Sequence, residues 1–407
     1  MSPAAAQADR EPVLRVEPVE AAAEDRFDRL RRIEWWDQDR LARAKVLVVG
    51  AGALGNEVLK QLALLGVGRV LVVDLDTVEL SNLSRAVLFR ERDEGRPKAE
   101  VAAEAVRAIY PQARVRAARA DVIHDVGLGV FHWADVVIGG LDNREARLAI
   151  NRACYRVGRP WVDGAIERLQ GVARGFAPPE GACYECTLGE VDWQMIERRR
   201  ACSLLTREEM EQGKVPTTPT TASVVAGIQV QEAVKLLHGL PDVLAGRGFV
   251  FDGMAHQSYI VEYARNPDCL SHETLPSEAL VRLPFRAADV TLARLLEEGR
   301  RRLDAPGAVL ELRNDVLWKL ECRACGAVEE AFRSLGRVLR GEARCPSCSE
   351  MRAPVLARTL RGGEPFLERT PAAIGVPPFD ALTARAGERE VALLLGGDEA
   401  EVLGEVA

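Results

Sequence analysis

Apolar runs and amphipathic segments alternate along the first two thirds of the chain. The segments 45–50 (KVLVVG) and 69–74 (RVLVVD) each hold four consecutive apolar residues before a terminal Gly or Asp, which is typical of buried parallel strands. The same pattern predicts strands at 134–140, 160–164, 171–176, 247–253 and 257–263, and helices at 27–44, 54–65, 97–109, 222–237 and from Arg144 onward. Strands that alternate with helices predict an α/β fold with a doubly wound sheet.

The remaining segments suggest how the chain is divided. Residues 1–24 are rich in Ala, Glu and Pro without periodicity, and we expect a disordered tail. Residues 183–220 form a long polar stretch with little periodicity, of a kind that is usually functional or disordered when it lies inside a compact domain. The pattern changes after Pro276, so we expect domains at 25–275 and 277–407. In the second, 290–303 predicts a helix and 387–397 a strand pair.

Composition narrows the class of protein. The 407 residues are 47% hydrophobic and 28% charged with a net charge of −7, a globular balance that argues against a basic nucleic-acid-binding protein. No apolar run is long enough to span a membrane, and the N-terminus does not resemble a secretory signal. We therefore expect a cytoplasmic protein whose nine cysteines serve purposes other than disulfides.

A glycine-rich loop joins the first predicted strand to the first predicted helix. Gly50, Gly52 and Gly55 form a GxGxxG motif, which lets the backbone approach a phosphate at a helix N-terminus. Asp74 ends the second strand, where a carboxylate can bind a ribose. This context predicts nucleotide binding, and an NAD-dependent dehydrogenase is the default alternative.

Polar residues after later strands favour phosphate chemistry over hydride transfer. Asn82, Arg85 and Lys98 follow Asp74, and Asp142 follows the strand at 134–140. Cations and a Mg²⁺-binding carboxylate stabilise the charge that develops when a triphosphate is attacked. Each residue also has a simpler interpretation, because Asp142 can cap the next helix and Arg85 and Lys98 can be surface charges.

Four motifs in order resemble the adenylating domain of ubiquitin-activating-type enzymes. They are GAGALGNEVLKQLALLGVG, DLDTVELSNLSR, GRPKAE and GLDNREARLAINRAC, and the resemblance covers residues 26–272. The superfamily includes bacterial adenylyltransferases that activate sulfur carriers for thiamin and molybdopterin synthesis. The resemblance implies a Rossmann-like adenylation domain that uses ATP. It also implies roles for site residues: Gly50, Gly52 and Gly55 at the phosphates, Asp74 at the ribose, Asn82, Arg85 and Lys98 around the triphosphate, and Asp142 on Mg²⁺.

Finer features point to one branch of this superfamily. Glu57 and GACYECTL (181–188) look closer to SUMO- and NEDD-type activating subunits, whereas Ser84 replaces an Asn common in the family. The segment RFDRL (26–30) resembles the family motif RYxRQ. By that resemblance Arg29 reaches the ATP of a partner subunit in a homodimer.

Two cysteine sets have metal-ligand spacing. Cys322, Cys325, Cys345 and Cys348 form two CxxC pairs typical of a Cys₄ zinc ribbon, against the alternative of buried thiol pairs. Cys183 and Cys186 form another CxxC, which the CxxH of Cys269 and His272 completes as a Cys₃His zinc site. A redox CxxC is the alternative for Cys183 and Cys186, but it leaves the distant CxxH unexplained.

Two cysteines remain. Cys154 lies among apolar residues and is predicted to be buried, whereas Cys202 follows three arginines in the polar stretch, where cations favour the thiolate. Related SUMO- and NEDD-type subunits carry their thioester cysteine in this crossover loop, so the resemblance makes Cys202 the candidate nucleophile, against an inert loop cysteine.

The resemblance implies that the protein adenylates the C-terminus of a ubiquitin-like protein, forms a thioester and passes the modifier to a conjugating enzyme. Some bacterial relatives of this arrangement serve antiviral defence. The alternatives are a sulfur-carrier adenylyltransferase and a non-catalytic scaffold. Residues 277–407 are then a possible docking module.

Overall fold

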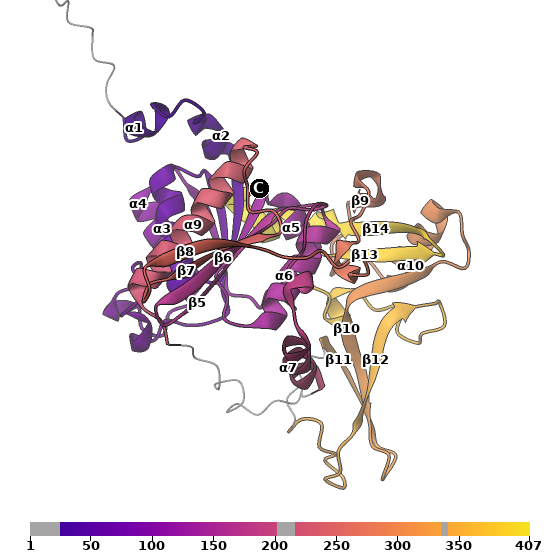
Figure 1. Cartoon of the computed structure of the whole chain (residues 1–407). Helices are drawn as coiled ribbons and strands as arrows, with labels where there is room; N and C mark the ends of the chain where they lie inside the picture. The colour runs from indigo at the N-terminus through magenta and orange to yellow at the C-terminus, as the bar shows by residue number, and fades with distance from the viewer. Residues whose placement is uncertain (1–24, 202–215, 335–340) are drawn as a thin grey trace, which may run out of the picture.

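A computed structural model describes residues 25–201, 216–334 and 341–407, which build two sheets (Figure 1). The larger sheet has eight strands in the order β3-β2-β1-β4-β5-β6-β7-β8. Its strands are β1 (Lys45–Val49), β2 (Arg69–Val73), β3 (Arg114–Ala118), β4 (Val136–Gly139), β5 (Trp161–Glu167), β6 (Gln170–Phe176), β7 (Arg247–Asp252) and β8 (Gln257–Glu262). Strands β1 to β5 are parallel, and β6 to β8 extend the sheet with antiparallel pairs. The predicted α/β class is confirmed, as a mixed sheet.

Helices cover both faces of this sheet. One apolar cluster joins it to α3 (Ala53–Leu65), α4 (Lys98–Ile109) and α9 (Pro219–His238), and another joins it to α5 (Leu128–Trp133) and α6 (Arg144–Arg156). Strands β1, β2 and β4 are almost fully buried because both faces of the sheet are covered there, which explains their unbroken apolar runs.

Two segments differ from the sequence-based prediction. The stretch 27–44 contains two short helices, α1 (Asp28–Arg31) and α2 (Gln38–Arg43), because Asp37 caps α2 with its side chain and starts a new helix. The stretch 183–220, expected to be irregular, contains α7 (Glu190–Ala201). Acidic residues in the first turn of α7 favour its N-terminus, but its sequence has no apolar stripe from which periodicity could predict a helix.

The second sheet has the order β11-β10-β13-β14-β9, with β12 also paired to β10. Its strands are β9 (Leu280–Leu283), β10 (Val309–Glu321), β11 (Val328–Ser334), β12 (Ala353–Leu360), β13 (Ala381–Ala386) and β14 (Arg389–Leu395), and α10 (Leu292–Leu303) packs against them. The strand pair predicted at 387–397 is wrong: this segment is the single strand β14, which follows a turn at Gly387 and pairs with β13.

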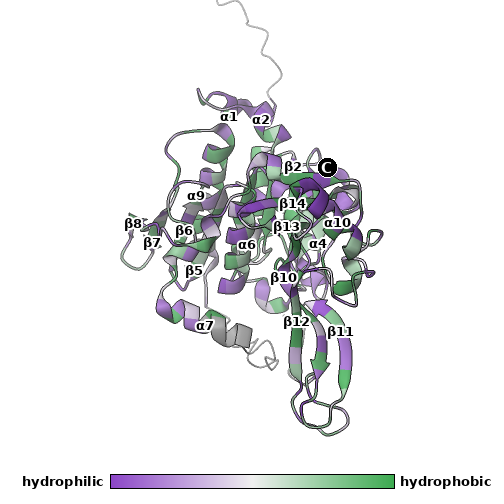
Figure 2. Cartoon of the chain, turned by 90° about the vertical axis from the view of Figure 1, so that its right-hand side faces the viewer, coloured by the Kyte–Doolittle hydropathy of each residue, from purple (hydrophilic) through white to green (hydrophobic). Residues whose placement is uncertain are grey.

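Strands β10, β11 and β12 form an arm that projects away from the body of the molecule on the side where α7 lies (Figures 1 and 2). The base of the second sheet shares an apolar cluster with the first, to which Phe379, Leu394 and Val406 contribute together with Phe131. The division at 275 therefore stays a prediction. Among the residues described, no helix combines the length and apolarity needed to cross a membrane.

Candidate active site

The GxGxxG loop leads from β1 into α3 and approaches the end of β4. Gly50 has a φ of +94°, and a Cβ there would lie 2.5 Å from the carbonyl oxygen of Gly140. A Cβ on Gly55 would lie 1.8 Å from the carbonyl oxygen of Gly50. Gly52, the N-cap of α3, faces open space, since a Cβ there would meet nothing within 4 Å. The loop thus offers main-chain N–H groups at a helix N-terminus with room for an anion.

Asp74, directly after β2, faces this loop. Its Oδ2 accepts a hydrogen bond from the Ala51 N–H at 2.6 Å, and its Oδ1 accepts one from the Asp76 N–H at 2.8 Å. Burial raises the pKa of Asp74, although the Ala51 N–H and the charge of Lys98 act against this shift. The carboxylate is therefore fixed beside the phosphate loop, where a ribose can donate to it.

Asn56 is a site residue that sequence reasoning missed. It is fully buried, and its Nδ2 donates to the carbonyl oxygens of Ala51 at 2.6 Å and Gly52 at 3.1 Å. Its Oδ1 accepts a hydrogen bond from the Leu88 N–H at 2.9 Å. Asn56 thereby holds the phosphate loop and ties it to the segment that carries Asn82 and Arg85. A polar residue on the buried face of an apolar helix was the available signal.

The segment after Asp74 presents the predicted cations and amide. Lys98 begins α4, and its Nζ lies 2.8 Å from Oδ2 of Asp76. Its side chain is only 12% exposed, so the alternative of a surface charge does not fit Lys98. The Asn82 side chain is buried and accepts a main-chain hydrogen bond within its own loop, while Arg85 Nη1 donates to Ser81 O at 2.7 Å.

Asp142 follows β4 and is exposed. The alternative that it caps α6 is wrong, because Asn143 is the N-cap and its Oδ1 accepts the Ala146 N–H at 2.8 Å. Since β1 and β4 are neighbours and Gly50 touches Gly140, Asp142 lies two residues beyond the point of closest approach to the phosphate loop. This is the switch point of the sheet, where ligands of such folds bind.

A buried charge network, also missed from the sequence, holds the segment before Asp142. Arg147 donates from Nε to Asp163 Oδ1 at 2.8 Å and also to the carbonyl oxygens of Leu141 and Gly164. Arg174 forms a second ion pair with Asp163, which is fully buried. A charged residue within an apolar strand was the only sequence signal for this network.

One predicted residue is not brought to this site, and another lies outside the described residues. Arg29 is exposed on α1, whose neighbours Arg26 and Phe27 contact Ile109 and Gly66 at the far ends of α4 and α3 (Figure 1). Within one chain, Arg29 therefore lies near the amino ends of the parallel strands, whereas the phosphate loop lies at their carboxyl ends. Cys202 lies outside the described residues; α7 ends at Ala201, immediately before it. Cys154 is fully buried, as predicted.

Cys183, Cys186, Cys269 and His272 present their ligand atoms within 4.8 Å of one another. Sγ of Cys183 lies 3.7 Å from Sγ of Cys186 and 3.6 Å from Sγ of Cys269, and Cys186 Sγ lies 3.3 Å from His272 Nε2. Thiolates around a tetrahedral zinc with bonds of about 2.3 Å lie about 3.8 Å apart. Burial raises the pKa of the Cys183 and Cys269 thiols, so a bound cation is what would make them thiolates at neutral pH.

The arm brings together the second set, Cys322, Cys325, Cys345 and Cys348, also within 4.8 Å. The Cys322–Cys348 and Cys325–Cys345 sulfur pairs are 3.4 Å and 3.6 Å apart. Cys325 and Cys348 are exposed, which does not fit the alternative of two buried thiol pairs. Both sets have the donors and spacing to hold a zinc ion.

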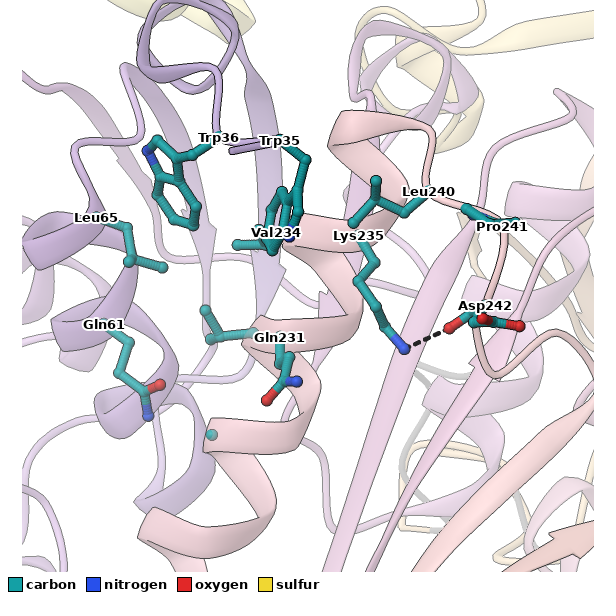
Figure 3. A pocket seen from close by; sticks show the side chains of 12 residues that line it. Trp35, Trp36, Gln61, Leu65, Gln231, Val234, Lys235, Leu240, Pro241 and Asp242 are labelled. Atoms are coloured by element: carbon teal, nitrogen blue, oxygen red, sulfur yellow. Dashed lines mark hydrogen bonds between the residues drawn. The ribbon is translucent and has the colours of Figure 1, made fainter. Parts of the chain in front are cut away.

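A groove of about 560 Å³ lies elsewhere, between the segment that precedes α2 and the helices α3 and α9 (Figure 3). Trp35 and Trp36 line one end, and Lys235, whose Nζ donates to the carbonyl oxygen of Asp242, lines the other. Leu65 at the C-terminus of α3 also lines it, so the groove is remote from the phosphate loop at the N-terminus of α3.

The glycine loop, the Asp74 carboxylate beside it and the switch point of the sheet together define a nucleotide-binding α/β protein. The sequence model of the ThiF family matches residues 26–271, so the chain belongs to the ThiF family. The SAMP-activating enzyme E1 of Haloferax volcanii is 38% identical over 242 residues, which cover 57% of this chain and 81% of that protein. The sulfur carrier protein adenylyltransferase of Thermus thermophilus is 35% identical over 243 residues, which cover 57% of this chain and 83% of that protein.

These relatives identify the protein as an enzyme, an E1-like adenylyltransferase, and they imply that it uses ATP. A crystal structure of E. coli MccB with ATP shares the fold, with a TM-score of 0.52 and 22% identity over 62% of this chain and 75% of that one. The family match ends at residue 271, before the second sheet begins.

Proposed function

We propose that this protein activates a ubiquitin-like protein with ATP. The C-terminal carboxylate of the partner attacks the α-phosphorus, a carboxylate oxygen–phosphorus bond forms, and the bond to the leaving pyrophosphate breaks. The loop that Gly50, Gly52 and Gly55 shape binds phosphate oxygens at the N-terminus of α3, and Asp74 accepts hydrogen bonds from the ribose. Asn82, Arg85 and Lys98 position the triphosphate and stabilise the charge that develops on it.

The observation that carries this proposal is the placement of Asp142. The residue is exposed beside the phosphate loop. Its carboxylate does not cap α6, because the side chain of Asn143 does so. An aspartate carboxylate is a suitable ligand for Mg²⁺, which would neutralise charge on the phosphates. A dehydrogenase requires neither this carboxylate nor the poorly exposed Lys98.

We propose that the adenylate is then captured as a thioester. The thiolate of Cys202 attacks the acyl carbon, a carbon–sulfur bond forms and AMP leaves. A conjugating enzyme next accepts the modifier on its own cysteine. The thioester cysteine in the crossover loop of the SUMO- and NEDD-type subunits, which this sequence resembles, supports the thioester step. The relative from Haloferax volcanii is named a SAMP-activating enzyme E1, which supports the activating reaction.

A homodimer completes the proposal. Arg29 lies too far from the site of its own chain, so it serves the site of a partner subunit. The half-exposed Trp35 beside the groove, together with Leu64 and Val224 on neighbouring helices, leaves an apolar surface that a second copy can cover. Sedimentation of the wild type as a dimer and of Trp35→Glu as a monomer would support this arrangement; two dimers would contradict it.

Both cysteine sets are proposed to hold structural zinc. The Cys₃His set joins the start of the crossover segment to the chain after β8, and the Cys₄ set closes the arm. Neither set leaves a ligand position open for water, so zinc there would supply stability and no chemistry.

The alternative is a sulfur-carrier adenylyltransferase, which the relative from Thermus thermophilus favours. ATP–pyrophosphate exchange tests the step that both functions share. Exchange should require a candidate ubiquitin-like protein and should stop when its C-terminus is amidated, because no carboxylate then remains. Exchange that is indifferent to the C-terminus would contradict adenylation.

A further inference from the structure

The loop at residues 119–127 starts beside the ribose-side carboxylate and is held by the second sheet. It follows β3, the edge strand of the eight-stranded sheet. The Asp74 N–H donates to Ala118 O at 3.1 Å, and the Ala120 N–H donates to Asp74 O at 3.3 Å. Val122 and Val126 of this loop are buried in the apolar cluster of the first sheet, so the loop is packed against that sheet as well.

Four hydrogen bonds cross from the second sheet to this loop and to the residue after it. They join Asn314 Nδ2 to Ile123 O at 2.8 Å, Arg313 Nη2 to Val126 O at 2.7 Å, Ser334 Oγ to His124 Nδ1 at 2.6 Å, and Asp380 Oδ1 to the Leu128 N–H at 2.7 Å. Three of these side chains lie at the base of the arm, on β10 and β11. The second sheet thus fixes both the main chain and one side chain of the loop.

Close packing reinforces these hydrogen bonds. Asp380 is 2% exposed and forms an ion pair with Arg313 at 3.2 Å. Phe379 has a φ of +56° and lies against two glycines: a Cβ on Gly127 or Gly129 would come within 2.6 Å of its main chain. Only glycine fits at these two positions, so the main chain around Gly127 and Gly129 packs directly against the main chain of Phe379.

We propose that the second sheet holds loop 119–127 in place to receive the base of ATP, with Arg313, Asn314 and Ser334 as positioning residues. The inference rests on the proposed ATP binding. The phosphates lie at Gly52 and the ribose at Asp74, so the base extends from the ribose toward β3 and this loop. A loop that is already ordered does not lose conformational freedom when the nucleotide binds, and this raises affinity.

The experiment compares two probes on the full-length protein by calorimetry, MgATP and magnesium tripolyphosphate. Tripolyphosphate reaches only the phosphate loop, whereas ATP also presents ribose and base. The Asn314→Ala/Ser334→Ala double variant should bind ATP about tenfold more weakly and tripolyphosphate as the wild type does. In pyrophosphate exchange its KM for ATP should rise about tenfold at an unchanged kcat.

The matched control is Glu390→Gln, which breaks another contact between the sheets. Glu390 forms two hydrogen bonds with Arg156, at 2.7 and 2.8 Å. Arg156 is the last residue of α6, so this contact lies at the amino ends of the parallel strands, whereas loop 119–127 follows the carboxyl end of β3. This variant should keep the ATP affinity of the wild type. If the double variant fails to fold, the single Ser334→Ala variant takes its place. It should show a smaller loss of ATP affinity in the same direction.

Three results would overturn the inference. They are ATP binding by both variants as tight as in the wild type, equal losses for ATP and tripolyphosphate, or the same loss in Glu390→Gln. If the wild type binds no ATP, the proposed function fails first and the inference falls with it, so the two failures are distinguishable.

Discussion

Asn143 Oδ1 accepts a hydrogen bond from the Ala146 N–H at 2.8 Å and so caps α6 in place of its neighbour Asp142. From the sequence alone, Asp142 is a candidate for this role. Because Asn143 provides the cap, the exposed carboxylate of Asp142 beside the phosphate loop is available for the Mg²⁺ binding that we propose.

Asp142→Ala should abolish ATP–pyrophosphate exchange and leave the melting temperature unchanged, because an exposed side chain that does not cap the helix contributes little to stability. Lys98→Ala should reduce exchange less completely. Asn143→Ala is the matched control and should show the reverse: it should lower the free energy of unfolding by about 1 kcal/mol and retain exchange. Normal exchange in Asp142→Ala would remove the Mg²⁺ assignment.

The Cys₃His set predicts a specific loss of metal. The purified protein should hold two zinc equivalents, one for each set, and His272→Ala should lower the content toward one. Elemental analysis checks both values. A single equivalent in the wild type would leave only one of the two sets credible as a zinc site.

The arm should depend on metal for its order. Residues at the base of the arm pack into the main cluster of the second sheet, and a separate small cluster of Leu317 and Leu320 with Ala331 lies beside it. These are too few side chains to stabilise the outer part of the arm without help. Chelation, or Cys325→Ser, should therefore make residues 322–348 sensitive to limited proteolysis. Mass spectrometry of the fragments locates the cuts. An arm that stays resistant after zinc removal would contradict a structural role for the metal.

The ion pair between Arg156 and Glu390 should make stability depend on pH. Burial acts to raise the pKa of Glu390, but the hydrogen bonds and charge of Arg156, with the charge of Arg385, hold it below the ordinary value. Its contribution is thus full above the unfolded value of about 4.3 and is lost as pH falls through the lower folded value.

Glu390→Gln should accordingly lower the free energy of unfolding by about 1–3 kcal/mol at pH 7, and the difference from wild type should shrink toward pH 3. Denaturant titrations at several pH values give this difference. A difference that does not depend on pH would show that the carboxylate charge is not the cause.

The parallel half of the fold and its glycine loop were predictable because both leave local signals. Four apolar residues in a row mark β1 and β2, and Gly50 and Gly55 occupy positions where no Cβ fits. The edge strand β3 was missed because it alternates exposed arginines with small apolar residues and has no unbroken run.

Other parts of the site depend on contacts between distant segments. Asn56 reaches Leu88, Arg147 reaches Asp163, and Asn314 reaches Ile123 across 191 residues. No periodicity or motif spacing encodes such pairs. The sequence marks Asn56 and Asp163 only as polar residues within apolar segments, and the fold alone identifies their partners. The two metal-ligand sets could be predicted from the sequence, because CxxC and CxxH spacings are typical of zinc ligands even when the two halves of a set are far apart in the chain.

The central claim is that this adenylyltransferase passes a ubiquitin-like protein through a thioester on Cys202. The most direct test is intact mass after incubation with MgATP and a candidate ubiquitin-like protein, with and without reducing agent. We predict a thiol-sensitive adduct in the wild type and in Cys154→Ala, and none in Cys202→Ala, which should retain pyrophosphate exchange. An adduct in Cys202→Ala would contradict the assignment of the nucleophile. Exchange without any adduct in the wild type would contradict the thioester step and favour a sulfur-carrier adenylyltransferase.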